Sequence, residues 1–138
     1  MQLFIKTFPL ILFLLLITKN LRAQQSISTS IHFDTNQHQL SPVAEAKLSE
    51  TLEAIPLRNI IRIALIGHTD SDGDLASNQK LSERRSLATF QYLIKKGIKK
   101  ETIETYSKGE VEPKADNKTS EGKAINRRVE VTIVYKAG

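Results

Sequence analysis

The feature that most constrains the fold of this chain is the run IIRIALIG, residues 60–67, a near-continuous series of β-branched and apolar side chains. Such a run is typical of a central strand that is buried on both faces of a sheet. Apolar side chains recur at helical spacing on either side of it, in residues 42–55, which Pro56 ends, and in residues 76–96, which Gly97 ends. The alternation of helix and strand predicts an α/β chain.

Further strands are predicted near both ends of the folded region. Residues 27–33 and 129–135 alternate apolar with polar side chains, which is the period of a half-buried strand. Ile103 and Tyr106 indicate a short strand, and the polar stretch 107–126, which contains Gly and Pro, is predicted to be a long loop. The resulting β-α-β-α-β-β order predicts one domain with an open sheet and helices packed on one side.

Residues 1–23 have the layout of a signal peptide, with Lys6 near the start, an apolar run over residues 7–18, and a polar end. The uncharged run is 12 residues long, shorter than the roughly 20 that cross a hydrocarbon core, which disfavours a permanent membrane anchor. Cleavage is expected after Ala23. The predicted mature domain is residues 24–138, and its predicted location is outside the cytoplasm.

Charge and composition exclude several classes of protein. The 138 residues carry a net charge of +5, but removal of the predicted signal takes away three basic residues and leaves 17 against 15 acidic ones. This small excess and the absence of Trp give little basis for nucleic-acid binding. The absence of Cys excludes a disulfide framework, a thiolate zinc site, a cysteine nucleophile and a lipid-bearing cysteine near the N-terminus.

The stretch GHTDSDGDLASNQKLSERR, residues 67–85, places three aspartates within five positions and ends on two adjacent arginines. It connects the predicted strand to the predicted helix, where α/β folds place ligands because the helix N-terminus offers free N–H groups. Asn78, Leu81 and Arg85 recur at i, i+3 and i+7, which keeps them on one helical face. A guanidinium on a partly apolar face needs an anionic partner, and Asp70 at the strand end is the natural candidate.

Two interpretations of Asp70 and Arg85 stay open on local spacing alone. In one, they form an internal salt bridge while Asp74 or Ser77 caps the helix. In the other, they face an open pocket and bind the two ends of a zwitterion, with Asp70 taking an ammonium group and Arg85 a carboxylate. The second interpretation predicts an amino acid moiety as the ligand.

The sequence gives weaker support for a metal site or a catalytic site than for a binding site. Asp70, Asp72 and Asp74 resemble the opening of a calcium loop, but leucines stand where that loop needs its glycine and its bidentate glutamate. The three histidines lack metal-binding spacings, so neither a metal nor a cofactor is predicted. There is no GxSxG motif, and the one nearby acid–base pair is His68 with Asp70. A binding function is therefore favoured over an enzymatic one.

The stretches GHTDSDGDLASNQKLSERRSLATFQYLIKKGI and ADNKTSEGKAINRRVEV closely resemble the OmpA-like C-terminal domain family, which includes the peptidoglycan-associated lipoprotein Pal and the stator protein MotB. The resemblance covers about residues 27–135, and its specific motifs are TD, N-x-x-L-S-x-x-R and NRR. These motifs contain Thr69, Asp70, Asn78, Leu81, Arg85, Arg127 and Arg128. The chain departs from the family at residues 107–110, where a glycine-aromatic-glycine-glutamate turn is common.

The resemblance implies an α+β two-layer sandwich with a mixed sheet, and non-covalent binding of peptidoglycan through the diaminopimelate residue of its stem peptide. The aspartate and arginine that hold the ammonium and carboxylate of that residue in the family correspond to Asp70 and Arg85. Asn78 corresponds to an asparagine of the same pocket, and Asp34 corresponds to the aspartate at the end of the first strand.

The resemblance extends the expected binding site to Thr69 and Leu81 and to the two arginines of the NRR run. Arg128 is expected to approach the ligand more closely than Arg127. The predicted protein is a stand-alone periplasmic module associated with the cell wall, with the outer membrane as a candidate location. Peptidoglycan is its expected partner, a partner protein in the envelope is left open, and no direct transmembrane anchor is expected after signal removal.

The alternative is a structural or protein-interaction module whose pocket is closed by a salt bridge between Asp70 and Arg85. The binding hypothesis predicts that Asp70→Ala or Arg85→Ala abolishes wall binding and leaves the fold intact. The alternative predicts that Asp70→Ala leaves Arg85 without a partner and lowers the stability of the domain.

Overall fold

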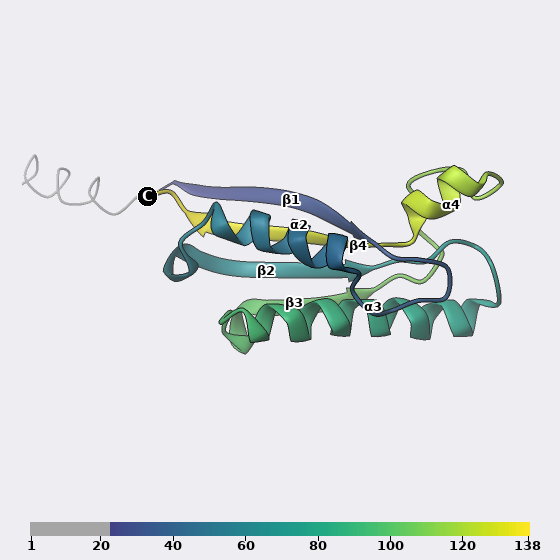
Figure 1. Cartoon of the computed structure of the whole chain (residues 1–138), viewed down its shortest axis with the longest axis horizontal. Helices are drawn as coiled ribbons and strands as arrows, with labels where there is room; N and C mark the ends of the chain where they lie inside the picture. The colour runs from purple at the N-terminus through teal and green to yellow at the C-terminus, as the bar shows by residue number, and fades with distance from the viewer. Residues whose placement is uncertain (1–22) are drawn as a thin grey trace, which may run out of the picture.

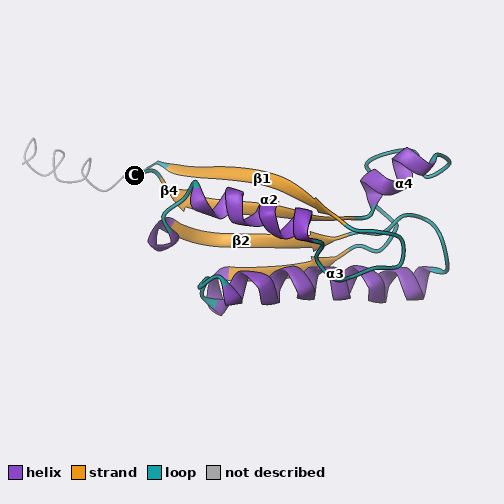
Figure 2. Cartoon of the chain, in the orientation of Figure 1, coloured by secondary structure: helices purple, strands orange, loops and turns teal. Residues whose placement is uncertain are grey.

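A computed structural model describes residues 23–138, so the predicted signal peptide lies outside the described residues except for Ala23. Four strands form one mixed sheet in the order β1-β4-β2-β3. β1 (Gln24–His32) and β2 (Ile60–Gly67) both pair antiparallel with β4 (Arg128–Lys136), and β3 (Ile103–Ser107) pairs parallel with β2. The open sheet and its helices (Figures 1 and 2) confirm the predicted α/β class and two-layer sandwich.

The two longer helices begin at side-chain caps. α2 (Pro42–Glu53) starts after Ser41, whose hydroxyl accepts a bond from the backbone of Ala44, and its proline stands at the first position, where no N–H is needed. α3 (Leu75–Lys95) starts after Asp74, whose carboxylate accepts the backbone N–H and the hydroxyl of Ser77. Both helices lie within two residues of the predicted ranges.

The core lies between the sheet and these helices. In the first and last strands, the core residues stand at every second position, as the predicted alternation requires. In α2, the core residues recur every four positions. The most deeply buried members are Ile31, Leu48, Ile63, Leu65, Leu93, Val129, Val131 and Ile133. On the opposite face of the sheet, the hydroxyls of Ser28 and Thr132 lie 3.1 Å apart in an exposed contact.

The prediction that β2 is buried on both faces is wrong. Ile63 and Leu65 are fully buried, but Arg62 is exposed and Ile66 is half-buried. β2 is central in the sheet, and its second face stays partly open because α2 and α3 cover the other one.

The loop predicted for residues 107–126 contains a helix, α4 (Ser120–Asn126), so the observed order is β-α-β-α-β-α-β. Thr119 caps it by accepting the backbone N–H of Gly122. Two short 3₁₀ turns, η2 (Leu57–Asn59) and η3 (Lys100–Thr102), precede β2 and β3. None of the described helices is both long enough and apolar enough to span a bilayer.

Candidate functional site

The polar motifs gather at one end of the molecule. β1, β2 and β3 finish there, α2 and α3 begin there, and α4 and the start of β4 complete the end (Figure 1). Gly67 lets α3 approach β2 closely, because a Cβ at this position would overlap the backbone carbonyl of Ser82. The N-terminal half of α3 therefore lies directly beside the loop that carries Thr69 and Asp70.

Arg85 lies at the centre of this end and is completely buried. Its guanidinium donates from Nε to the carbonyl of Gln37 at 2.8 Å, from Nη1 to that of His68 at 2.9 Å, and from Nη2 to that of Asp34 at 3.2 Å. Its Cζ also lies 5.2 Å from the centre of the Phe33 ring. Arg85 thus joins the loop after β1 to the end of β2.

No salt bridge to Arg85 forms anywhere in residues 23–138. Burial lowers the pKa of Arg85 to about 10, while the charge of nearby Asp70 acts in the opposite direction and that of Arg127 acts with burial. The group still carries its charge at neutral pH. The site therefore contains a buried cation whose contacts are neutral carbonyl groups.

Asp70 is also buried, but its ion pair is with Arg127, at 3.1 Å between Oδ2 and Nη1. Its Oδ1 accepts the backbone N–H of Asp72 at 3.1 Å. An internal salt bridge between Asp70 and Arg85, one of the two local interpretations, is therefore absent from the structure. The nearest strong partner of Asp70 comes from residue 127, too far along the chain for local spacing to suggest it.

Asn78 and Thr69 hold the loop in place. Asn78, buried on α3, donates through Nδ2 to the carbonyl of Asp72 at 3.0 Å, to that of Asp70 at 3.4 Å, and to the carboxylate of Glu110. The backbone N–H of Thr69 donates to the carbonyl of Gly109, and its Oγ1 is buried with no hydrogen-bond partner in the described structure. Leu81, one turn before Arg85, is half-buried.

The two arginines of the NRR run have different partners. Arg127 donates to Asp70 and to the carbonyl of Phe33 at 3.0 Å. Arg128 is nearly fully buried and forms a two-contact pair with Glu130, at 2.9 and 2.8 Å. The expectation that Arg128 approaches the ligand more closely than Arg127 stays a prediction, although it is Arg127 that contacts Asp70. Strand alternation directs Arg128 to the same side of β4 as Glu130.

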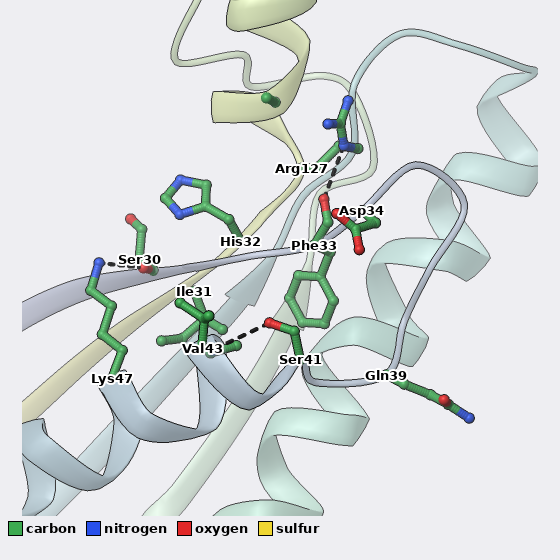
Figure 3. Close-up of a pocket in the computed structure, with 12 residues that line it drawn as sticks. Ser30, Ile31, His32, Phe33, Asp34, Gln39, Ser41, Val43, Lys47 and Arg127 are labelled. Carbon is green, nitrogen blue, oxygen red and sulfur yellow. Dashed lines mark hydrogen bonds between the residues drawn. The ribbon is translucent and has the colours of Figure 1, made fainter.

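An open pocket of about 360 Å³ adjoins this cluster between the end of β1, the start of α2 and α4. Figure 3 shows Asp34 and Arg127 together at one side of it, with His32 and Lys47 at the other. The carboxylate of Asp34 is exposed, whereas its carbonyl is one of the acceptors of Arg85. A second depression, of about 580 Å³, shares Asp34 and Arg127. Asp34 and Arg127 are thus the predicted site residues that line both of these pockets.

His68 was considered in the sequence only as a base beside Asp70, but the structure gives it a different environment. Its carbonyl holds Arg85, and its ring is buried with both nitrogens lacking a hydrogen-bond partner in the described part of the chain. The ring lies 4.0 Å from the carboxylate of Glu130. Burial, followed by the charge of Arg128, lowers the pKa of His68, and Glu130 opposes this in part. The histidine is neutral at neutral pH.

Gln37 and Glu110 are site residues that the sequence reasoning did not identify. Gln37 contributes a backbone carbonyl to Arg85, and any residue type could supply it. Glu110 accepts from Asn78 and lies in the turn where the chain departs from the family pattern. In residues 23–138, no three side chains among His, Cys, Asp and Glu are grouped to hold a metal ion.

Comparisons with known proteins agree with this arrangement. Residues 32–127 match the OmpA family. Outer membrane protein A of Bordetella avium is 42% identical over 102 residues, which cover 74% of this chain and 53% of that protein. The peptidoglycan-binding protein ArfA of Mycobacterium bovis is 36% identical over 87 residues, which cover 63% of this chain and 26% of ArfA. The chain therefore spans about half of the first relative and about a quarter of the second.

A solved structure has the same fold. The peptidoglycan-associated lipoprotein from Burkholderia pseudomallei superimposes with a TM-score of 0.64 at 25% sequence identity, and the match covers 78% of this chain and 89% of that one. Family match, sequence identity and fold agree. This chain belongs to the OmpA family.

Proposed function

We propose that this protein binds peptidoglycan without covalent chemistry and that its site holds the diaminopimelate residue of the stem peptide. The observation that carries the proposal is the environment of Arg85, a buried guanidinium with three neutral acceptors and no salt bridge within residues 23–138. Burying a cation without an anionic partner costs free energy, which a ligand carboxylate would offset. Each of Nη1 and Nη2 has one N–H beyond its bond to a carbonyl, so a carboxylate could still be bound.

Asp70 supplies the complementary half of the site. Diaminopimelate carries an ammonium and a carboxylate on one carbon at the end of its side chain, whereas lysine has an ammonium alone. A ligand ammonium beside Asp70 would compete with Arg127 for the carboxylate, and the ligand carboxylate would take Arg85. Recognition of both groups by one aspartate and one arginine explains why a lysine-containing stem peptide would bind more weakly.

Access to Arg85 requires a local movement. Both pockets beside the site are lined by Asp34 and Arg127, whereas Arg85 is covered by the carbonyls of Asp34 and Gln37. Residues 34–40 join β1 to α2 and are the segment that can withdraw these two carbonyls. We therefore include opening of this loop as part of binding, with the carbonyl of His68 remaining in place.

The relatives support the general proposal of peptidoglycan binding. ArfA is named for peptidoglycan binding and the lipoprotein for peptidoglycan association, and both match the region that carries Asp70 and Arg85. We extend this to a protein held at the cell wall in the periplasm, near the outer membrane. We propose a binding role rather than a catalytic one, because the carboxylate of Asp70 is bonded to Arg127 and to the backbone N–H of Asp72.

The second candidate function is a structural or protein-interaction module with a closed site. It is favoured by the ion pair of Asp70 with Arg127 and by the complete burial of Arg85, which together leave the site internally bonded. The two candidates differ in one measurable property. A closed module keeps its pairs in the presence of the wall, whereas a binding module exchanges them for the ligand.

Co-sedimentation with purified sacculi tests the proposal. Protein prepared from the envelope should pellet with sacculi whose stem peptide carries diaminopimelate and stay in solution with sacculi that carry lysine. Arg85→Lys keeps the positive charge but loses the planar fork, so pelleting should drop strongly. Arg84→Lys is the matched control, because Arg84 is the exposed neighbour on α3. Equal pelleting with both types of wall, or no pelleting by a folded protein, would favour the closed module.

A further inference from the structure

The end of the molecule opposite the candidate site carries two adjoining apolar grooves. Their volumes are about 360 Å³ and about 310 Å³, and both are lined by Leu57, which is 45% exposed. The apolar lining comes from the end of α2, from η2 and from the turn after α3. It consists of Leu52, Ile55, Pro56, Leu57, Ile60 and Ile98.

Five basic residues surround these grooves, namely Arg58, Lys95, Lys96, Lys99 and Lys100, and all of them are exposed. Arg58 and Lys99 line one groove and Lys96 the other. Within residues 23–138, none of the five forms a salt bridge. The grooves and these five residues are called the basic end below.

The nearby opposing charges are fewer. Glu53 lines the first groove and Glu101 lies in η3. Lys96 also contacts the Tyr92 ring, with Nζ 5.3 Å from its centre. The excess of positive charge at this end is notable because residues 24–138 together carry 17 basic and 15 acidic side chains.

Helix stabilisation explains only part of this charge. Lys95 is in the last turn of α3, where a cation interacts favourably with the helix dipole. Arg58 is in η2, and Lys99 and Lys100 lie beyond the turn that ends α3. These three cations therefore have no role in capping α3.

The chain enters the domain at the same end. β1 starts there, because Gln24 pairs with Lys136, and Tyr135 pairs with Ile60 of the groove lining. The figure places the start of β1 and the C-terminus together, away from α4 (Figure 1).

We propose that the basic end docks on the surface of a bilayer that contains anionic phospholipid. Exposed lysines beside an apolar side chain are complementary to such a surface, because the cations meet the headgroups while the apolar group reaches the acyl boundary. Leu57 is the apolar group in the best position to do this. β2 runs from the basic end to the candidate site over eight residues, about 25 Å of extended strand, so both ends can be engaged at once.

Vesicle co-sedimentation tests this docking. Protein purified from the cell envelope is mixed with phosphatidylcholine vesicles that either contain or lack phosphatidylglycerol. We expect binding to the anionic vesicles that weakens at high salt. The double variant Lys99→Gln with Lys100→Gln should weaken vesicle binding about 30-fold. Leu57→Gln should also weaken vesicle binding, but it should change the salt dependence less than the double variant does.

The matched control is Lys114→Gln combined with Lys118→Gln, which removes the same charge from exposed positions at the other end. It should bind the anionic vesicles nearly as well as the unaltered protein. All variants share the same N-terminus, so any contribution of residues 1–22 cancels in the ratio, and circular dichroism checks that each is folded. Equal loss in both double variants, or equal binding to neutral and anionic vesicles, would overturn the proposal.

This docking is independent of the ligand proposed for the other end. Failure of vesicle binding with retained pelleting on sacculi would overturn the membrane proposal alone. Vesicle binding without sacculus binding would overturn the proposed function alone.

Discussion

Arg85 is the residue on which both the stability and the binding of this domain depend. Its substitution by alanine removes the donor of three buried or partly buried carbonyl bonds, from Gln37, His68 and Asp34. We expect Arg85→Ala to lower the free energy of unfolding by about 3 kcal/mol or more, because the carbonyls lose their partner and a cavity is left. This differs from the sequence-based expectation that the variant leaves the fold intact.

Urea denaturation followed by circular dichroism measures this loss. Arg84→Ala, on the exposed side of the same turn, should change the free energy of unfolding by less than about 0.5 kcal/mol. If Arg85→Ala proves as stable as Arg84→Ala, the carbonyl contacts do not hold the loop after β1.

His68 should make stability depend on pH. Its pKa is lowered in the folded protein, mainly by burial and then by Arg128, so the unfolded chain takes up a proton at a higher pH than the folded one. The contribution of this histidine to stability is therefore complete above about pH 6.5 and is lost as the pH falls toward the lowered value. We expect the melting temperature to fall between neutral pH and pH 5.

His32 also has a lowered pKa, mainly through burial and then through Lys47, so it contributes in the same direction. The two are separated by melting His68→Gln and His32→Gln across the same pH range. A larger part of the pH dependence should disappear with His68, whose ring is the more deeply buried. An unchanged pH profile in His68→Gln would contradict the assignment.

At the residue scale, the sequence predicted which side chains gather but not how they pair. Asp34, Thr69, Asp70, Asn78, Arg85 and Arg127 do meet at one end of the fold. Two of the three partners of Arg85 stand 48 and 51 residues away in the loop after β1, and all three act through backbone carbonyls. Contacts through backbone carbonyls do not depend on the type of side chain, so the sequence does not indicate them. The sequence reasoning therefore expected a carboxylate side chain as the partner of Arg85.

At the scale of elements, the contact between β2 and α3 depends on Gly67. A Cβ added there would lie well inside van der Waals distance of the Ser82 carbonyl and 2.6 Å from the Ser86 hydroxyl. We expect Gly67→Ala to destabilise the domain by about 3 kcal/mol, because helix and strand must separate. Chemical denaturation tests this, with Gly138→Ala as the control, since a Cβ at residue 138 meets nothing within 4 Å. Equal stability of the two variants would contradict the close approach.

The loop before α4 should depend on Asn126, which is completely buried. Its Oδ1 accepts the backbone N–H groups of Lys114 and Ala115, and its Nδ2 donates to the Ala115 carbonyl and to the Asn117 side chain. Asn126→Ala should cost about 2–4 kcal/mol and speed amide exchange in residues 113–126. Asn117→Ala removes one of these contacts and should have a much smaller effect; equal exchange in the two would show that Asn126 does not organise the loop.

The same contacts explain why α4 was missed. The helix has seven residues, too few to show a helical period, and its sequence SEGKAIN has little apolar content. Its position is set by Asn126 bonding to residues 9 to 12 positions away. By contrast, α2 and α3 have caps and long apolar faces, so their ranges could be read from the sequence to within two residues.

At the scale of the whole molecule, periodicity identified the four strands and the class of fold. It could not give the order β1-β4-β2-β3, because strand pairing is decided by contacts between distant segments. In that order one face of β2 is only partly buried. The apolar run in the sequence does not indicate this difference between the two faces. It also brings the ends of three strands and the starts of two long helices together, which is how one end becomes the candidate site.

The central claim is that Asp70 and Arg85 recognise a zwitterionic group, and calorimetric titration with soluble stem peptides tests it most directly. The protein should bind a stem peptide that contains diaminopimelate, whose side chain ends in an ammonium and a carboxylate. It should bind the same peptide with lysine at that position far more weakly. Asp70→Asn should weaken diaminopimelate binding at least about 30-fold. Asp72→Asn, which breaks the exposed contact with Lys123 at 2.8 Å, should leave it nearly unchanged. Equal affinity for both peptides, or full affinity in Asp70→Asn, would contradict the account.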